Sequence, residues 1–155
     1  MPRGAWRPTD RRDSSGPLLI DTHIWLWYLN AVEDAISAGA LAFLRKSASD
    51  AGLLVSDMSV WELGTKAAKG KLTLHPSVTS WIDRAARAPG IAFAPVDRDI
   101  LLASTQLPGA IHGDPVDRIL VASAIAADIP LVTADRAILE YADATGALSA
   151  CDARP

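Results

Sequence analysis

The sequence is poor in several features that other protein classes require. Its single cysteine, Cys151, excludes an internal disulfide, and this composition fits a reducing, cytoplasmic setting. Asp, Arg or Pro interrupts every apolar run before it reaches the roughly 18–20 residues of a membrane-spanning helix, so we expect no membrane segment. The first 16 residues carry four arginines without an apolar core, which indicates a flexible leader rather than an export signal.

Motifs for nucleotides, zinc and phosphorylation are missing as well. Neither G-x-G-x-x-G nor G-x-x-x-x-G-K-[ST] occurs, which disfavours a nucleotide-binding enzyme. The three histidines are not spaced as zinc ligands. A phospho-acceptor signalling domain would need a lysine after its last strands, and no lysine follows Lys71.

The length and charge indicate one folded domain with a special use of its acidic residues. The chain has 155 residues, half of them hydrophobic, which suffices for a single domain over residues 17–155. A net charge of −3 disfavours a nucleic-acid binder, because phosphate contacts need Lys and Arg. This objection weakens if several carboxylates form one cluster that a divalent cation neutralises.

Short apolar runs alternate with helical patterns along the chain. Buried strands are expected at residues 17–20, 52–55, 90–93 and 131–133, with a weaker fifth at 147–150. Helices are expected at residues 23–29, 36–48, 57–68, 76–87, for about eight residues after Asp97, and at 114–127 and 135–141. This alternation predicts an α/β fold with three layers, α/β/α, around a central parallel sheet of four to five strands.

Two aspartates directly follow expected strands. Ligands of open parallel sheets bind beyond the carboxyl ends of the strands, so Asp21 and Asp135 are candidates for a functional site. Each has an ordinary alternative role as the N-cap of the helix that follows. Thr22 could cap its helix instead, which would free Asp21.

Two further acids lie on helices that start from the same edge. Glu62 matches a capping box begun by Ser59, but a cap at residues 56–57 would place Glu62 beyond the first turn. At that position apolar side chains would flank Glu62, and a carboxylate among apolar side chains needs a positively charged partner. Asp117 occupies the third helical position, where negative charge suits the helix dipole. Because Asp114 is the better capping residue there, Asp117 is the better candidate for chemistry.

Together, the four acids predict a metal site. Converging carboxylates repel one another and raise each other's pKa, unless a divalent cation holds them ionised. Mg²⁺ and Mn²⁺ are hard ions that keep several waters and accept carboxylates directly. The predicted ligands and catalytic residues are Asp21, Glu62, Asp117 and Asp135.

Four pieces of the sequence carry these acids. They are Leu-Ile-Asp21-Thr-His-Ile-Trp-Leu-Trp, Val-Ser-Asp-Met-Ser-Val-Trp-Glu62-Leu, His112-Gly-Asp-Pro-Val-Asp117-Arg-Ile-Leu-Val-Ala and Leu-Val-Thr133-Ala-Asp135. In this order and spacing, over about residues 18–150, they resemble the PIN-domain ribonucleases, and within them the VapC toxins of bacterial toxin–antitoxin pairs.

The resemblance implies a PIN-like fold, Mg²⁺ or Mn²⁺ dependence, endonucleolytic cleavage of RNA and inhibition by a cognate VapB-type antitoxin. It assigns the same four acids as the site, and it gives Thr133 the role of orienting a metal-bound water. We also expect a homodimer. The competing interpretation is a non-catalytic PIN-like module that binds RNA or protein, although retention of all four acids weighs against it.

Residues near the acids are candidates for supporting roles. Those that could orient water or support the ligands, besides acting as ordinary hydrogen-bonded residues, are Thr22, Thr133, His23 and His112. Candidate RNA phosphate contacts, whose default role is a solvated charged face, are Lys66, Lys69, Lys71 and Arg118. The tryptophans at 25, 27 and 61 are not expected all to be buried, and an exposed one would suit an antitoxin segment or a dimer face.

Overall fold

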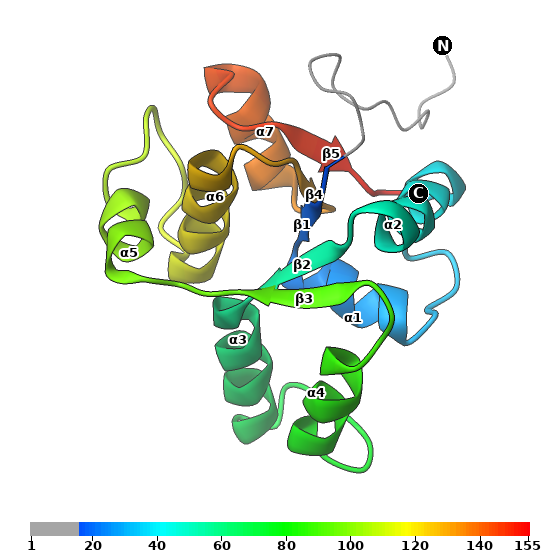
Figure 1. Cartoon of the computed structure of the whole chain (residues 1–155). Helices are drawn as coiled ribbons and strands as arrows, with labels where there is room; N and C mark the ends of the chain where they lie inside the picture. The colour runs from blue at the N-terminus through cyan, green and yellow to red at the C-terminus, as the bar shows by residue number, and fades with distance from the viewer. Residues whose placement is uncertain (1–15) are drawn as a thin grey trace.

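The structure is a computed structural model that describes residues 16–155. The leader expected over residues 1–16 lies outside these residues, apart from Gly16. Five parallel strands form one sheet in the order β3-β2-β1-β4-β5 (Figure 1). The strands are β1 (Leu18–Ile20), β2 (Leu53–Ser56), β3 (Ile91–Ala94), β4 (Leu131–Thr133) and β5 (Ala150–Asp152). The predicted parallel α/β sheet is confirmed, and β5 begins at the last residue of the stretch expected to form it.

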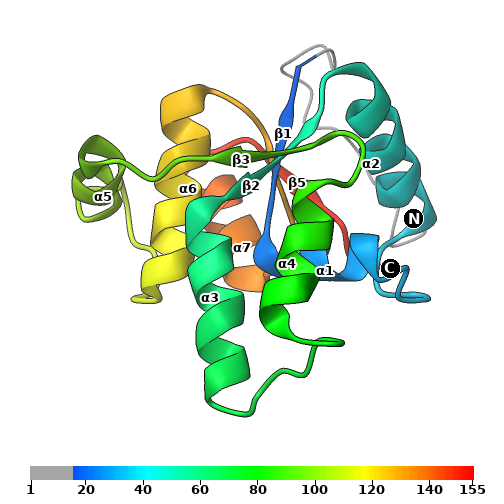
Figure 2. The same ribbon diagram turned by 60° about the horizontal axis from the view of Figure 1, so that its bottom comes forward.

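Seven helices of the described chain surround the sheet (Figures 1 and 2). They are α1 (Thr22–Leu29), α2 (Ala38–Asp50), α3 (Asp57–Ala68), α4 (Val78–Ala86), α5 (Arg98–Ser104), α6 (Pro115–Ala127) and α7 (Arg136–Thr145). None of them is long and apolar enough to cross a membrane.

Alternating side chains of the strands divide the core into two layers. On β1, Leu18 and Ile20 pack with residues of α1, α2, α3 and α4, whereas Leu19 packs with residues of α6 and α7. Trp25 of α1 is fully buried in the first layer, while Trp61 of α3 is 57% exposed. The expectation that the tryptophans are not all buried is therefore confirmed.

Several helix ends differ from the sequence expectation because capping side chains fix them. Ser37 accepts a hydrogen bond from the Ala40 N–H, so α2 begins two residues later than expected. Ser77 caps α4 by accepting a hydrogen bond from the Ser80 N–H, so this helix begins at Val78 and not at Pro76 as expected. Helix α7 continues past its expected end and stops at Gly146, whose φ of 63° suits a left-handed C-cap.

Candidate active site

Asp21 follows β1 directly and is almost fully buried. One carboxylate oxygen, Oδ1, accepts a hydrogen bond from the His23 N–H at 3.3 Å, so Asp21 caps α1. The other, Oδ2, accepts a hydrogen bond from the Thr133 hydroxyl at 2.6 Å. The alternative in which Thr22 caps the helix is therefore wrong, because Thr22 already lies in its first turn. Both oxygens of Asp21 are engaged by the protein.

Glu62 lies in the second turn of α3 and is also held by the protein. Ser56 caps this helix, so the capping box begun by Ser59 does not form. Instead, Oε2 of Glu62 accepts a hydrogen bond from Thr22 at 3.0 Å, and Oε1 pairs with Lys66 Nζ at 2.6 Å. The buried hydroxyl of Ser59 lies 2.8 Å from that of Thr22 and completes a link between α1 and α3.

Asp117 lies in the first turn of α6, which Asp114 caps as expected. Its Oδ2 is 3.1 Å from Nε2 of His112, in the loop that precedes the helix. Nδ1 of His112 accepts a hydrogen bond from the Asp114 N–H, which leaves Nε2 to face Asp117. Within residues 16–155, no hydrogen bond or ion pair engages Oδ1 of Asp117.

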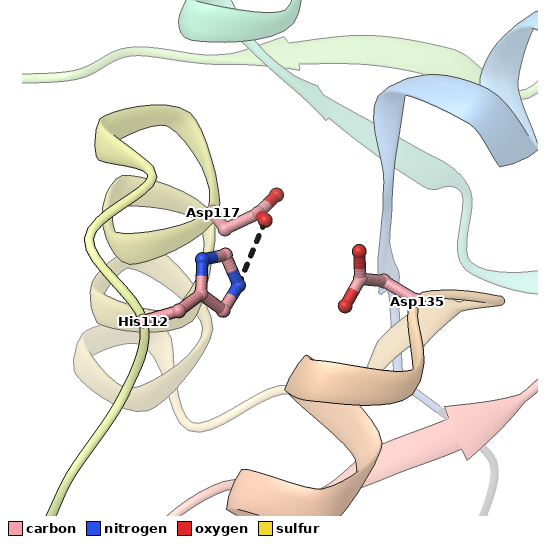
Figure 3. A group of neighbouring side chains, drawn as sticks. All are labelled: His112, Asp117 and Asp135. Carbon is pink, nitrogen blue, oxygen red and sulfur yellow. Dashed lines mark ion pairs between the residues drawn. The ribbon is translucent and has the colours of Figure 1, made fainter.

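Asp135 lies at the other side of the same space, at the start of α7. Its Oδ1 accepts a hydrogen bond from the Ile138 N–H and thereby caps the helix. Its own N–H donates to the Thr133 hydroxyl oxygen at 3.0 Å. Figure 3 shows the carboxylate of Asp135 pointing toward Asp117 and His112, and one ligand atom from each of these three residues lies within 4.8 Å of the others.

The electrostatics connect all four acids. Partial burial is the largest cause of a raised pKa at Asp117, followed by the negative charges of Asp114, Asp21, Asp135 and Glu62 in that order, and together they bring this pKa to about 7. Burial also raises the pKa of Asp21, against the opposing hydrogen bond from Thr133. Where burial and repulsion disfavour ionised carboxylates, a bound cation stabilises them most.

The donor set fits Mg²⁺ or Mn²⁺. Oδ1 of Asp117 and the second oxygen of Asp135 receive no hydrogen bond from the described residues, and carboxylate oxygens are the ligands that these hard ions prefer. Both nitrogens of His112 are already engaged, Nδ1 by the Asp114 N–H and Nε2 by Asp117, so the open ligand atoms are carboxylate oxygens. Direct binding through Asp21 and Glu62 stays a prediction, since donors of the protein already engage both oxygens of each.

The residues expected to support the site differ in burial and in their contacts with the acids. Thr133 is fully buried and donates its hydroxyl hydrogen to Asp21, so it positions that carboxylate. Its role in orienting water stays a prediction. His23 is half-exposed beside Asp21, with Nδ1 at 4.0 Å from Oδ1. Sequence reasoning considered Ser59 only as a helix cap and missed its contact with Thr22, although its spacing of three residues from Glu62 places both on one face of α3.

The four basic candidates are also distributed unevenly. Lys66 contacts the acidic site through Glu62. Arg118 turns away to donate from Nε to the Ser104 carbonyl at 3.0 Å, which fastens α6 to α5. Lys69 is the exposed C-cap of α3, and Lys71 follows it in the next loop. Their contacts with RNA stay predictions.

The family model for the PIN domain matches residues 18–144, a range that contains all four acids. The chain belongs to the PIN domain family. It is 27% identical over 124 residues to Ribonuclease VapC22 of Mycobacterium tuberculosis, across 80% of this chain and 91% of that relative. The family resemblance drawn from the four sequence pieces is therefore confirmed.

Solved structures share the PIN fold at lower sequence identity. VapBC2 from Rickettsia felis, bound to a DNA fragment from its promoter, has a TM-score of 0.61 at 17% identity and covers 88% of this chain and 99% of its own. FitAcB from Neisseria gonorrhoeae has a TM-score of 0.59 at 17% identity, with 86% and 95% covered. These likenesses confirm the PIN-like arrangement of helices around the sheet.

Proposed function

We propose that this PIN domain is a metal-dependent endoribonuclease whose site consists of Asp21, Glu62, Asp117 and Asp135. The observation that carries the proposal is the facing pair Asp117 and Asp135, whose ligand atoms lie within 4.8 Å of each other and of His112. The likeness to Ribonuclease VapC22 supports RNA as the substrate.

The side chains divide the work between binding and positioning. Asp117 and Asp135 would hold Mg²⁺ or Mn²⁺ through the oxygens that no described residue engages, and Nε2 of His112 fixes the orientation of Asp117. Thr133 fixes Asp21 behind them. When bound, such an ion lowers the pKa of water and offsets the charge that develops on a scissile phosphate.

No nucleophilic side chain is needed for this hydrolysis. Cys151, the single thiol, is buried on β5, and burial raises its pKa to about 11, so it is a poor nucleophile. Water is the nucleophile that the acidic site serves. The products are then two RNA fragments from one hydrolysed phosphodiester bond.

We further propose that the chain is the toxin of a toxin–antitoxin pair, held inactive by a VapB-type antitoxin. The likeness to Ribonuclease VapC22 and to the VapBC2 and FitAcB structures supports this assignment. A homodimer is also proposed, with Trp61, which is 57% exposed, as a candidate residue of the dimer face. Light scattering of the purified chain tests the dimer.

The deciding experiment compares RNA cleavage by the parent chain, free of any partner, with that of Asp21→Asn and Asp117→Asn. The parent should cleave only with Mg²⁺ or Mn²⁺, and both variants should be nearly inactive. Asp83→Asn, which removes an exposed carboxylate from α4, is the matched control and should keep full activity. Equal cleavage by the site variants and the parent would contradict the proposed site.

A further inference from the structure

A pocket of about 250 Å³ lies beside the acidic site, between α1 and the end of α3. Thr22 and Lys66 line it, and both of these residues also contact Glu62. The pocket therefore adjoins the carboxylates directly. The link from Thr22 to Ser59 and Glu62 fastens the two helices that form its walls.

The pocket combines an apolar wall, an aromatic ring and positive charge. Leu26, Leu63 and Leu72 supply the wall. The imidazole of His23 lines it and packs against Trp27, with ring centroids 5.6 Å apart. Lys66 and Lys71 complete the lining. Single-stranded nucleic acids are bound by this combination, in which aromatic rings stack on bases and cations track the phosphates.

We propose that this pocket is a subsite for one nucleotide of the RNA, next to the phosphate that is cleaved. The base stacks on His23 against the leucine wall, and Lys66 and Lys71 contact the neighbouring phosphates. The inference rests on the proposed ribonuclease activity. It makes His23 and the leucine wall the residues that bind the base at one position of the substrate.

Size and charge favour a nucleotide over a protein segment. Pockets for drug-sized ligands measure about 300–1,000 Å³, so about 250 Å³ suits a smaller group such as a single base. Lys71 and Lys66, which also pairs with Glu62, are complementary to phosphates, whereas the other carboxylates of the site would repel an RNA that no cation held. The pocket thus supplies attraction where the acidic site lacks it.

The first test pairs protein variants with altered substrates. His23→Ala removes the stacking ring, and Leu72→Trp fills the pocket. We expect each to lower kcat/KM about tenfold, mainly through KM, which corresponds to about 1.4 kcal/mol of stacking. Lys46→Ala, on the distant exposed pair with Asp50, is the control and should match the parent. Circular dichroism confirms that each variant is folded.

An abasic nucleotide scanned through the substrate then separates stacking from an indirect effect on Asp21. At one position next to the cut, the parent should lose about tenfold and His23→Ala should lose almost nothing more. If His23→Ala and the abasic change multiply their effects at every position, the pocket does not hold a base and the proposal is wrong.

A binding measurement keeps this outcome distinct from failure of the proposed function. In an Asp117→Asn background, which we expect to be nearly inactive, Leu72→Trp should weaken binding of a short single-stranded RNA about tenfold. An unchanged Kd overturns the subsite. Absence of cleavage by the parent chain, with either metal, would instead overturn the ribonuclease activity.

Discussion

The two halves of the acidic site are built differently. On one side, Asp21 and Glu62 have all their carboxylate oxygens engaged by Thr133, the His23 N–H, Thr22 and Lys66. On the other side, Asp117 and Asp135 face each other, and each keeps one oxygen that no described residue engages.

This difference separates two tasks that a metal site must perform. Asp21 and Glu62 form the engaged half. Hydrogen bonds and an ion pair hold these carboxylates in place without a cation, so they supply negative charge in a fixed geometry. In the open half, Asp117 and Asp135, burial and then repulsion from the neighbouring carboxylates raise the pKa of Asp117, and the unengaged oxygens offer ligand atoms. In the proposed site, a cation would therefore be attracted by four charges and bound directly by two of the carboxylates.

The largest effect is expected from Asp117→Asn, which removes charge from the open half. Cleavage should fall at least about 100-fold, since loss of a residue that only supports a metal ligand already costs about 10–100-fold. Mn²⁺ affinity measured by calorimetry should fall with it. Unchanged Mn²⁺ affinity would show that the ion binds elsewhere.

Thr133→Val tests the engaged half and should have the next largest effect. It leaves Oδ2 of Asp21 buried without its donor, so the free energy of unfolding should fall by about 1–3 kcal/mol. Metal-dependent activity should fall about 10–100-fold through misplacement of Asp21.

Thr133→Ser is the control for this substitution, because it keeps the hydroxyl. It should restore most of the activity while leaving a small packing defect. If Thr133→Val and Thr133→Ser cleave RNA equally well, the hydroxyl does not position Asp21.

The sequence predicted the fold and the placement of the four acids at one edge of the sheet, but it did not predict their division into two halves. The capping alternatives for Asp21 and Asp135 proved compatible with a site, because a carboxylate has two oxygens and a cap uses one. Glu62 is different, since its position relative to the helix start had to be known before the capping box could be rejected.

Long-range contacts account for what the sequence left open. Thr22 meets Glu62 across 40 positions, and Thr133 meets Asp21 across 112. Local patterns contain no information on such pairs, which arise when parallel strands bring their carboxyl ends to one edge. The same holds for Arg118, whose turn toward Ser104 depends on how α5 packs against α6.

A smaller effect is expected from Glu62→Gln, which sharpens the contrast with Asp117. Glutamine keeps an acceptor for Thr22 but loses the ion pair with Lys66. We expect cleavage to fall about tenfold, the lower end for a supporting residue, with Mn²⁺ affinity reduced less than by Asp117→Asn. An equal loss of Mn²⁺ affinity in the two variants would mean that Glu62 binds the ion directly.

The smallest effect concerns the pH dependence of stability without metal. The pKa of Asp117 rises from 3.8 to about 7 on folding, so its contribution to stability is complete below about pH 4 and is lost as the pH rises through 7. Because Asp117 is partly exposed, solvent screening reduces the effect, and we expect Tm to fall by about 2–4 °C from pH 5 to pH 8. Mn²⁺ should reverse this fall, because it favours the ionised carboxylates. In Asp117→Asn, Tm should depend less on pH between pH 5 and pH 8. If Tm falls as much as in the parent, another group of the site titrates over this range.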